Sequence, residues 1–330
     1  MTLAVTEEER MIADAAERLF AERAPVGRLR RYRDSGDEKR FDPALWDTMS
    51  ALGFAGAELD LAQRCVLSEA AGAVLASEPL ATTFFALDLL PGHLSPSGVT
   101  VAWDEAGRTN VRRAGEGLVV RGQKRQVEHA GTSTHFVVTA AIDGRSCVAL
   151  VARGERVVVD VTNRVDLHPA GCVRFEDAPA ELLGGADFER ALDRATIVHC
   201  AGMLGAAQRA FELTLDYLKT RQQFGVPIGS FQALQHRAAR LYVELALTRS
   251  AVARAARADD PDLPVLASVA KIRCGDTFQR VTEEAIQMHG GIGMTDEHDI
   301  VLYLKRAMVA EHTYGNRDFH RRRFATLSGF

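Results

Sequence analysis

Residues 221–225, Arg-Gln-Gln-Phe-Gly, combine a fixed positive charge, an aromatic ring and a glycine directly after a stretch with helical periodicity. Helix termination explains Gly225 and Pro227, because a basic residue in the last turn followed by Gly and Pro commonly ends a helix. It does not require the aromatic residue Phe224. The segment therefore allows a second interpretation, which is contact with a bound molecule.

A second segment with this character is Gln-Met-His-Gly-Gly-Ile-Gly at 287–293. Gly290 and Gly291 suit a corner between two helices, which needs backbone freedom. They also suit a place where a backbone without side chains touches a ligand, with Gln287 as a polar neighbour. Neither segment alone decides between the two interpretations.

The sequence lacks the other short motifs that carry chemistry. Gly115-Glu116-Gly117 has no third glycine to complete a dinucleotide-binding fingerprint, because Val120 stands at that position. There is no P-loop, HExxH or GxSxG, and the ten histidines show no metal-ligand spacing, so we expect no metal site. The five cysteines lie at least 25 residues apart, which favours buried thiols over disulfides or a zinc knuckle.

Length and charge restrict the protein class further. The 330 residues suit about two domains, and the net charge of −4 argues against binding the phosphate backbone of nucleic acids. No stretch approaches the ~20 apolar residues that span a bilayer, and the acidic N-terminus lacks an apolar signal region. We therefore expect a cytoplasmic protein that binds neither nucleic acid nor a membrane.

Helical patterns fill the first part of the chain. Thr6 and Glu9 form a capping box ahead of one helix, which we expect to end near Pro25. A second helix is predicted after Pro43, and an Ala-rich third one over residues 61–78.

Short β-branched runs follow between residues 98 and 182, separated by turn residues, and predict a small antiparallel sheet or barrel. Asp143-Gly144 is a hairpin signal. The runs do not alternate with long helices, which disfavours a parallel Rossmann sheet. The five runs are 99–103, 118–121, 136–140, 147–151 and 157–161.

Residues 188–328 contain no strand-like run and show helical stripes with breaks at 225–227, 260–261 and 290–291. These breaks predict four long helices in an antiparallel bundle. The predicted fold class is therefore α+β. Its expected parts are an N-terminal helical domain at 1–92, a central antiparallel β domain at 93–185 and a C-terminal four-helix bundle at 186–330.

The two polar segments, with Gln232 eleven residues after Arg221 and with Tyr314-Gly315 further on, resemble the C-terminal domain of the acyl-CoA dehydrogenases. The resemblance is close over residues 190–325, and the order of helices, strands and helices extends it loosely to the whole chain. It implies the family's fold and its reaction, the α,β-dehydrogenation of an acyl-CoA thioester. In that reaction a base removes the α-proton while FAD accepts the β-hydride.

In that family, the RxxFG and QxxGG segments reach across a dimer interface to the FAD of the neighbouring subunit. The chemistry suits the residue types: an arginine offers forked donors to a pyrophosphate, and a phenyl ring offers an apolar face. Glutamine amides can bond to adenine, ribose or phosphate, and glycines let the backbone approach closely. The implied FAD-binding residues are Arg221, Phe224, Gln232, Gln287, Gly290 and Gly291.

The usual catalytic carboxylates of the family are missing. Aligned without gaps, its YEGT-like segment becomes Thr313-Tyr314-Gly315-Asn316, so Tyr314 stands at the carboxylate position. A phenol with an unperturbed pKa of about 10 is a poor base at neutral pH. An alternative base position in the first bundle helix falls near Ala195, and neither Glu189 nor Asp193 matches its register. We therefore predict no catalytic residue in this chain.

The central domain departs from the family as well. Trp103–Gly107 resembles the family's acidic-Gly-Ser loop only weakly. Gln126-Val127-Glu128-His129 lacks the hydroxyl of the Trp/Ile-Thr/Ser pattern that lines the flavin. Residues 80–98 pass quickly into strand, where relatives carry more helix.

The segments that would bind a neighbour's FAD are thus present. The residues that would perform the catalytic chemistry are missing. The resemblance favours a non-catalytic β-type subunit of a heteromeric α2β2 acyl-CoA dehydrogenase in fatty acid or steroid catabolism. An α-type partner would supply the base and most of the isoalloxazine site. Such heterotetramers resemble those that actinobacteria use on steroid side-chain acyl-CoAs, and the family implies an electron-transfer flavoprotein as electron acceptor.

Two alternatives stay open. One is an autonomous flavoenzyme with an unusual base such as Glu128, His129 or Glu311. The other is a flavin-free scaffold that kept the fold without the cofactor. The retained Arg221 and Gln232 argue against the scaffold, which has no need of them.

Overall fold

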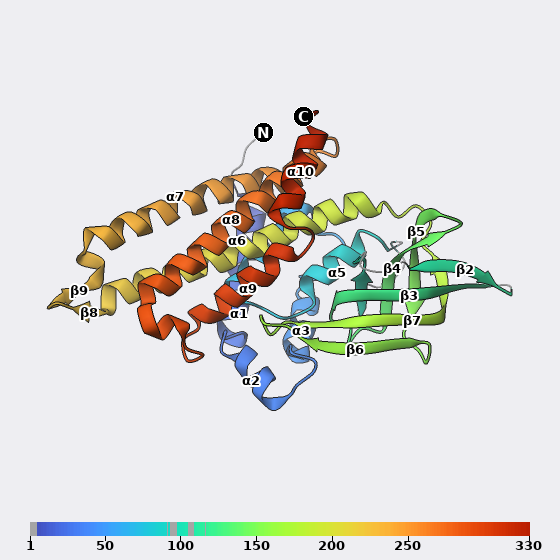
Figure 1. Ribbon diagram of the computed structural model, residues 1–330, viewed down its shortest axis with the longest axis horizontal. Helices are drawn as coiled ribbons and strands as arrows, with labels where there is room; N and C mark the ends of the chain where they lie inside the picture. The colour runs from blue at the N-terminus through green and yellow to red at the C-terminus, as the bar shows by residue number, and fades with distance from the viewer. Residues whose placement is uncertain (1–4, 91, 93–97, 105–108, 116) are drawn as a thin grey trace. The chain divides into compact units, whose positions relative to one another are not determined.

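The computed structural model describes residues 5–90, 92, 98–104, 109–115 and 117–330 (Figure 1). The chain folds into two compact units, each built from more than one stretch of sequence. Unit 1 comprises Met1–Arg28, Leu59–Ala76 and Thr196–Phe330, and unit 2 comprises Leu29–Glu58 and Ser77–Ala195. The predicted division into three domains stays a prediction.

Unit 1 is helical, apart from a two-stranded hairpin. Its longest helices pack in a bundle, in which α8 contacts α7, α9 and α10. The first residues of α6, up to Ala195, group with unit 2. The helices are α1 (Glu7–Arg23), α4 (Leu61–Ala73), α6 (Phe188–Thr220), α7 (Gln232–Ala255), α8 (Leu263–His289), α9 (Ile300–His312) and α10 (Arg317–Leu327).

Helix α1 begins at the predicted capping box. The Thr6 hydroxyl accepts a hydrogen bond from the Glu9 amide at 3.1 Å, and the Glu9 carboxylate accepts one from the Thr6 amide at 3.3 Å. The same carboxylate is buried and pairs with Arg257 beyond the end of α7, with one contact at 2.8 Å. One glutamate therefore caps its own helix and ties that helix to the bundle.

Helices α4 and α6 cross at a distance that only glycine permits. A Cβ on Gly205 would lie 1.9 Å from the Glu69 carbonyl oxygen, and a Cβ on Gly72 would lie 2.0 Å from the Gly202 carbonyl oxygen. Real Cβ contacts stay beyond 3.0 Å. Two glycines, one on each helix, thus set the approach of the two backbones.

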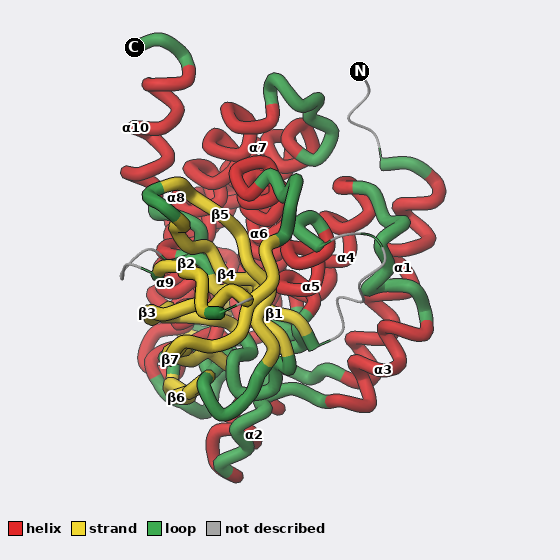
Figure 2. Tube along the Cα trace, turned by 90° about the vertical axis from the view of Figure 1, so that its right-hand side faces the viewer, coloured by secondary structure: helices red, strands yellow, loops and turns green. Residues whose placement is uncertain are grey.

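Unit 2 contains a seven-stranded sheet (yellow in Figure 2). The strands pair in the order β1-β4-β2-β3-β7-β5, β6 pairs with β7, and a further β4–β5 pairing closes the sheet into a barrel. The strands are β1 (Val99–Ala102), β2 (Asn110–Ala114), β3 (Gly117–Glu128), β4 (His135–Ile142), β5 (Arg145–Ala152), β6 (Val157–Asn163) and β7 (Pro169–Leu182). Its helices are α2 (Arg28–Ser35), α3 (Pro43–Ala51) and α5 (Leu80–Leu87).

The barrel interior is apolar. Phe136 and Phe175 meet edge to face with ring centroids 6.0 Å apart, surrounded by buried valines. Asp143-Gly144 forms the predicted two-residue hairpin between β4 and β5, with φ of 50° and 77° and with Ile142 opposite Arg145. Positive φ at both central residues matches the right-handed twist of the flanking strands.

The fold class is as predicted, and several elements differ in detail. The β domain is not purely antiparallel, because β1 pairs with β4 in parallel. Helix α5 occupies 80–87, where a rapid passage into strand was expected, and α4 ends at Ala73, not at residue 78. Helix α2 and strands β2 and β7 were not predicted, and α10 adds a fifth helix after the predicted four.

Candidate functional site

The 221–225 segment forms a hairpin that follows α6. Strands β8 (Gln222–Gln223) and β9 (Val226–Pro227) pair antiparallel, and Phe224-Gly225 forms the turn with φ of 55° and 80°. Simple helix termination is therefore incomplete as an explanation. The Phe224 side chain is 91% exposed, and among the described rings it lies edge to face with Phe231, at a centroid distance of 6.0 Å.

An exposed phenylalanine in the left-handed region combines two unfavourable features. A bulky residue at positive φ is an outlier that costs about 1–3 kcal/mol. The ring of Phe224 also gains little from burial in this chain. Such strain persists at sites where a ligand or partner uses the geometry.

Arg221 and Gln232 lie at the two ends of this hairpin segment. The Arg221 amide continues the helix by donating to the Tyr217 carbonyl at 2.8 Å, while its side chain is exposed and makes no ion pair in the described part of the chain. Gln232 is the first residue of α7, whose N-terminus receives no side-chain cap from Phe231. A free cation and an uncapped helix N-terminus both favour an anion.

The 287–293 segment closes α8 and continues as a short 3-10 helix, η2 (Gly290–Met294). Gly290 has φ 65° and ψ −143°, a conformation essentially restricted to glycine. Gly291 has no positive φ, and a Cβ there would meet nothing within 4 Å. Gln287 and both glycines are exposed. The fold thus explains Gly290 but does not require glycine at 291.

Three neighbouring rings support this corner from within unit 1, and no sequence pattern indicated them. The His289 ring lies 4.5 Å from Tyr217 and 4.6 Å from His298, centroid to centroid. His289 is buried, and its Nδ1 donates to the Ala285 carbonyl at 2.7 Å. Burial lowers the pKa of His289. A neutral, fixed imidazole thus lies directly before Gly290.

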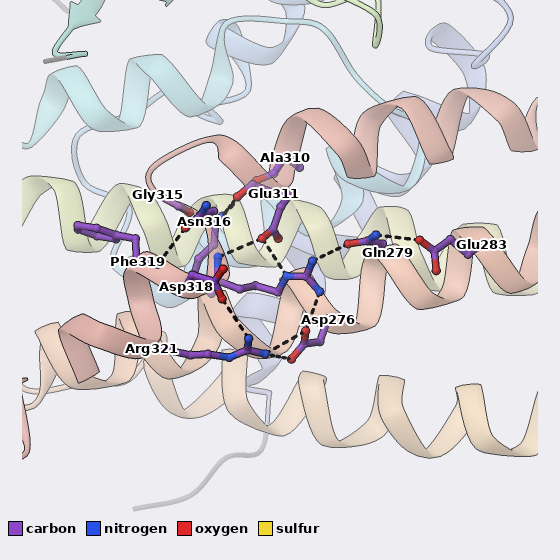
Figure 3. A network of polar contacts seen from close by, with 12 residues as sticks. Asp276, Gln279, Glu283, Ala310, Glu311, Gly315, Asn316, Asp318, Phe319 and Arg321 are labelled. Atoms are coloured by element: carbon purple, nitrogen blue, oxygen red, sulfur yellow. Dashed lines mark hydrogen bonds and ion pairs between the residues drawn. The ribbon is translucent and has the colours of Figure 1, made fainter. Parts of the chain in front are cut away.

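The segment at the expected base position is fixed by buried contacts (Figure 3). The Lys271 ammonium is buried and donates to the carbonyls of Ala310, Glu311 and Gly315 at 3.2, 2.9 and 2.7 Å. Between them, Tyr314 has φ 59°, is buried and packs against the His199 ring at 5.5 Å. The position at which the family resemblance places the carboxylate is therefore a packed phenol.

Glu311 is committed to an ion pair. Its Oε1 accepts from the Arg317 amide at 3.0 Å and from Arg317 Nε at 2.9 Å (Figure 3). The same guanidinium donates to Asp276 at 2.8 Å and to Gln279 at 2.7 Å. The Glu311 carboxylate is therefore held in place by the Arg317 guanidinium and by the Arg317 backbone amide.

Glu128 and His129 belong to a buried polar cluster in unit 2. Glu128 lies 3.4 Å from Arg164, which also bonds to the buried Asp166 at 2.8 Å. Burial lowers the pKa of His129 to about 4, opposed by the neighbouring Glu128 charge. The end of β3, at which the family resemblance places a hydroxyl, thus holds buried and ion-paired side chains.

The remaining positions that the sequence singled out offer no base in register. Ala195 is buried and carries only a methyl group, Asp193 is also buried, and Glu189 is exposed. Trp103 and Asp104 lie in the described chain, whereas residues 105–107 of the loop-like segment lie outside it. Among the described residues, no group of three His, Cys, Asp or Glu side chains is placed to hold a metal ion.

Unit 2 contains a cavity of about 1150 Å³ between β4, β5 and the start of α6. Lys124 is buried beside it and donates to the Thr139 hydroxyl at 2.9 Å. The buried Thr109 hydroxyl has no hydrogen-bond partner among the described residues. Apolar walls come from residues such as Val148 and Phe188.

No described helix is long and apolar enough to cross a bilayer.

Sequence comparisons assign the family. A family model described as "Acyl-CoA dehydrogenase, C-terminal domain" matches residues 184–327. Over 92% of its length, the chain is 31% identical to acyl-CoA dehydrogenase IpdE2 of Mycolicibacterium smegmatis, of which 93% is covered. The chain therefore belongs to the acyl-CoA dehydrogenase family, a family of FAD-binding oxidoreductases. It is also 48% identical over 115 residues to IpdE2 of Mycobacterium tuberculosis, 35% of each chain.

Solved structures agree with this fold. A chain of the ChsE4-ChsE5 complex from Mycobacterium tuberculosis superposes with a TM-score of 0.91 at 24% identity, covering 100% of this chain and 99% of that one. A chain of the Tcur3481-Tcur3483 steroid acyl-CoA dehydrogenase, G363A variant, gives 0.89 at 28% identity, with 99% of both chains covered. Both neighbours are heteromeric complexes.

Proposed function

We propose that this chain is a non-catalytic, β-type subunit of a heteromeric acyl-CoA dehydrogenase and that it completes the FAD site of a partner subunit. One observation carries the proposal. The residues suited to FAD are exposed and uncommitted, while the two expected base positions hold the packed Tyr314 and Ala195. A chain that offers residues for FAD but no catalytic base suits a flavin site whose chemistry depends on another chain.

Gly291 supports the flavin part of the proposal. Its backbone conformation and its open surroundings would accept alanine in the isolated chain. Glycine there is explained by a molecule that approaches the backbone too closely for a side chain. The uncapped start of α7 and Arg221, which makes no ion pair among the described residues, suit the phosphates of a dinucleotide.

FAD, when bound, supplies the hydride acceptor for oxidation of the acyl thioester. The residues of this chain would do the binding. The guanidinium of Arg221 would neutralise pyrophosphate charge, and Gln232 and Gln287 would hydrogen-bond the ribose or adenine. The ring of Phe224, exposed on its turn, would cover an apolar face of the dinucleotide. No residue of this chain then has to move the α-proton.

The partner and substrate parts rest on the structural relatives. Both complexes described above contain two different chains, and one of them is a steroid acyl-CoA dehydrogenase. We infer an acyl-CoA dehydrogenase-like α-type partner in a heterotetramer, with a steroid side-chain acyl-CoA as the substrate class. An electron-transfer flavoprotein is the electron acceptor that we infer.

A second candidate is favoured by one observation. The cavity in unit 2, with its buried Lys124 and unpartnered Thr109 hydroxyl, has room for a ligand of its own. An autonomous flavoenzyme would bind its ligand in such a cavity, and it would also need an unusual base, for which the sequence offers Glu128, His129 and Glu311. The residues that line the cavity do not include these three. Turnover by the pure chain, lost on Glu128→Gln, His129→Gln or Glu311→Gln, would favour this candidate over the subunit.

Matched glycine variants test the proposed function. Gly291→Ala should leave folding and assembly of the co-expressed complex intact while lowering its FAD occupancy at least tenfold. Gly154→Ala, at another open glycine without positive φ, should change neither. Arg221→Ala should also lower FAD occupancy, and Arg221→Lys should restore part of it. Unchanged FAD content in both Gly291→Ala and Arg221→Ala complexes would instead favour the flavin-free scaffold.

A further inference from the structure

The two segments proposed to bind FAD come from different helices, and a pair of rings joins them. Arg221 follows the end of α6 and Gly290 follows the end of α8, at the same end of the bundle (Figure 1). Tyr217 lies one helical turn before Arg221, whose amide donates to the Tyr217 carbonyl at 2.8 Å. The Tyr217 ring stacks on the ring of His289, with centroids 4.5 Å and planes 26° apart. Because His289 directly precedes Gly290, this stack connects one segment to the other.

The His289 ring is restrained by further contacts. Its Nδ1 faces the Ala285 carbonyl oxygen at 2.7 Å, and since a carbonyl only accepts, Nδ1 carries the proton. The η2 turn folds back over the same residue, so that a Cβ on Gly293 would lie 3.0 Å from the His289 Cβ. The His298 ring lies 4.6 Å away, and its own Nδ1 accepts from the Ile300 amide at 3.2 Å. The imidazole is thus fixed by α6, by its own helix and by the turn that follows.

The other nitrogen of the imidazole takes no part in these contacts. His289 Nε2 is buried and has no hydrogen-bond partner among the described residues. Burial lowers the pKa of His289, so the ring is neutral and Nε2 is an acceptor without a donor. His289 therefore acts through the position of its ring and through Nδ1. A phenyl ring at 289 would keep the stack and lose only the Nδ1 bond.

The Gly290 corner depends on such support. Gly290 and Gly291 are exposed and have no side chains that could pack against the bundle. The residue that anchors this corner is His289, which is buried.

We propose that Tyr217 and His289 are positioning residues of the FAD site. Their stack fixes the Gly290 corner relative to Arg221, so that one dinucleotide meets both segments in place. A preorganised site binds more tightly, because the ligand does not have to order the groups that contact it. The inference rests on the proposed function, and it names residues that act through the proposed FAD contacts.

The test uses the complex of this chain with a candidate α-type acyl-CoA dehydrogenase chain from the same organism. The complex is stripped of FAD and titrated with FAD, and flavin fluorescence gives the dissociation constant. His289→Ala and Tyr217→Leu should each raise that constant about fivefold, the factor that corresponds to one aromatic pair. His289→Phe should restore it to within about twofold of wild type, because the ring returns. Sedimentation and circular dichroism report assembly and folding, and Tyr217→Leu, at a half-buried residue, carries the test if His289→Ala does not assemble.

Two comparisons separate positioning from general stability. His320→Ala is the matched control, since His320 is also a buried histidine of unit 1, with Nε2 2.9 Å from the Tyr314 carbonyl oxygen. It should lower the thermal midpoint and leave the FAD dissociation constant within about twofold of wild type. The double variant Tyr217→Leu/His289→Ala should raise the constant about fivefold, like each single variant, because both remove the same stack.

Three results would overturn the inference while the subunit role stands. The first is a wild-type complex that holds FAD and variants at 217 and 289 that bind it equally well. The second is a loss in His289→Phe as large as in His289→Ala, which would mean that the imidazole itself acts on FAD. The third is a double variant weakened about 25-fold, which would mean that the two residues act independently. A wild-type complex that binds no FAD would end both the inference and the proposed function.

Discussion

Gly205→Ala should destabilise the protein, although alanine is the better helix former. In a helix interior, replacing glycine by alanine normally stabilises by about 1 kcal/mol. Here the new methyl would lie 1.9 Å from the Glu69 carbonyl oxygen, so the two backbones would have to separate by more than 1 Å to reach the 3.0 Å that real contacts keep. Overpacking of this kind costs about 1–3 kcal/mol, and the size of the required shift places it at the upper end. We expect a net loss of about 2 kcal/mol.

Gly202→Ala, three residues earlier on the same helix, provides the control. Its Cβ would meet the Ser68 hydroxyl oxygen at 3.1 Å, a contact that a side-chain rotation can relieve. Urea unfolding followed by circular dichroism should therefore show a lower midpoint for Gly205→Ala and little change for Gly202→Ala. A midpoint for Gly205→Ala equal to or above wild type would refute the glycine-dependent crossing.

Two further perturbations concern buried charge. Arg317→Gln should cost about 2–4 kcal/mol of unfolding free energy, because Glu311 loses its charged partner while remaining largely buried. Arg321→Gln, which removes an exposed arginine, should cost less than about 1 kcal/mol. Equal losses of unfolding free energy in the two variants would contradict this ranking. Burial, the largest cause at both sites, lowers the pKa values of His129 and His320 to about 4. The unfolded state therefore binds more protons between pH 6.5 and 4, so the unfolding free energy should fall as pH drops through this window, by up to about 3 kcal/mol per histidine. Replacing both histidines by asparagine should flatten that pH dependence. An unchanged slope of unfolding free energy against pH would contradict the role of the two histidines.

Features that depend on a few neighbouring residues could be predicted. The capping box at Thr6 and Glu9 and the hairpin at Asp143-Gly144 are local, since both ends of each interaction lie within a few residues. The helix breaks near 225 and 290 were equally local. The fold class followed from the order of these patterns.

Elements held by distant partners were missed. Strand β7 contains Pro169, Gly171 and Pro179, which weaken a strand pattern, yet it pairs with β3, β5 and β6 and is stabilised from both sides. Helix α5 is rich in threonine and phenylalanine, residues typical of strands, and tertiary packing buries them in a helix.

The candidate site shows the same division. The residue types of Arg221, Gln287 and Gly291 were available from the sequence, as was the tyrosine at 314. The surroundings of these residues could not be predicted, because the buried Lys271 donates hydrogen bonds to three carbonyls of a segment about forty residues away. Nothing in the sequence distinguishes that lysine from a solvated one. Only the structure shows that the base position is a closed, packed corner.

The most direct test of the subunit role is to purify this chain alone and together with a candidate α-type acyl-CoA dehydrogenase chain from the same organism. Mass and absorbance near 450 nm, where flavin absorbs, are recorded for both preparations. We predict a lone chain without flavin and a yellow complex that contains fewer than one FAD per chain. A yellow homo-oligomer of this chain alone, with one FAD per subunit and acyl-CoA turnover, would contradict it.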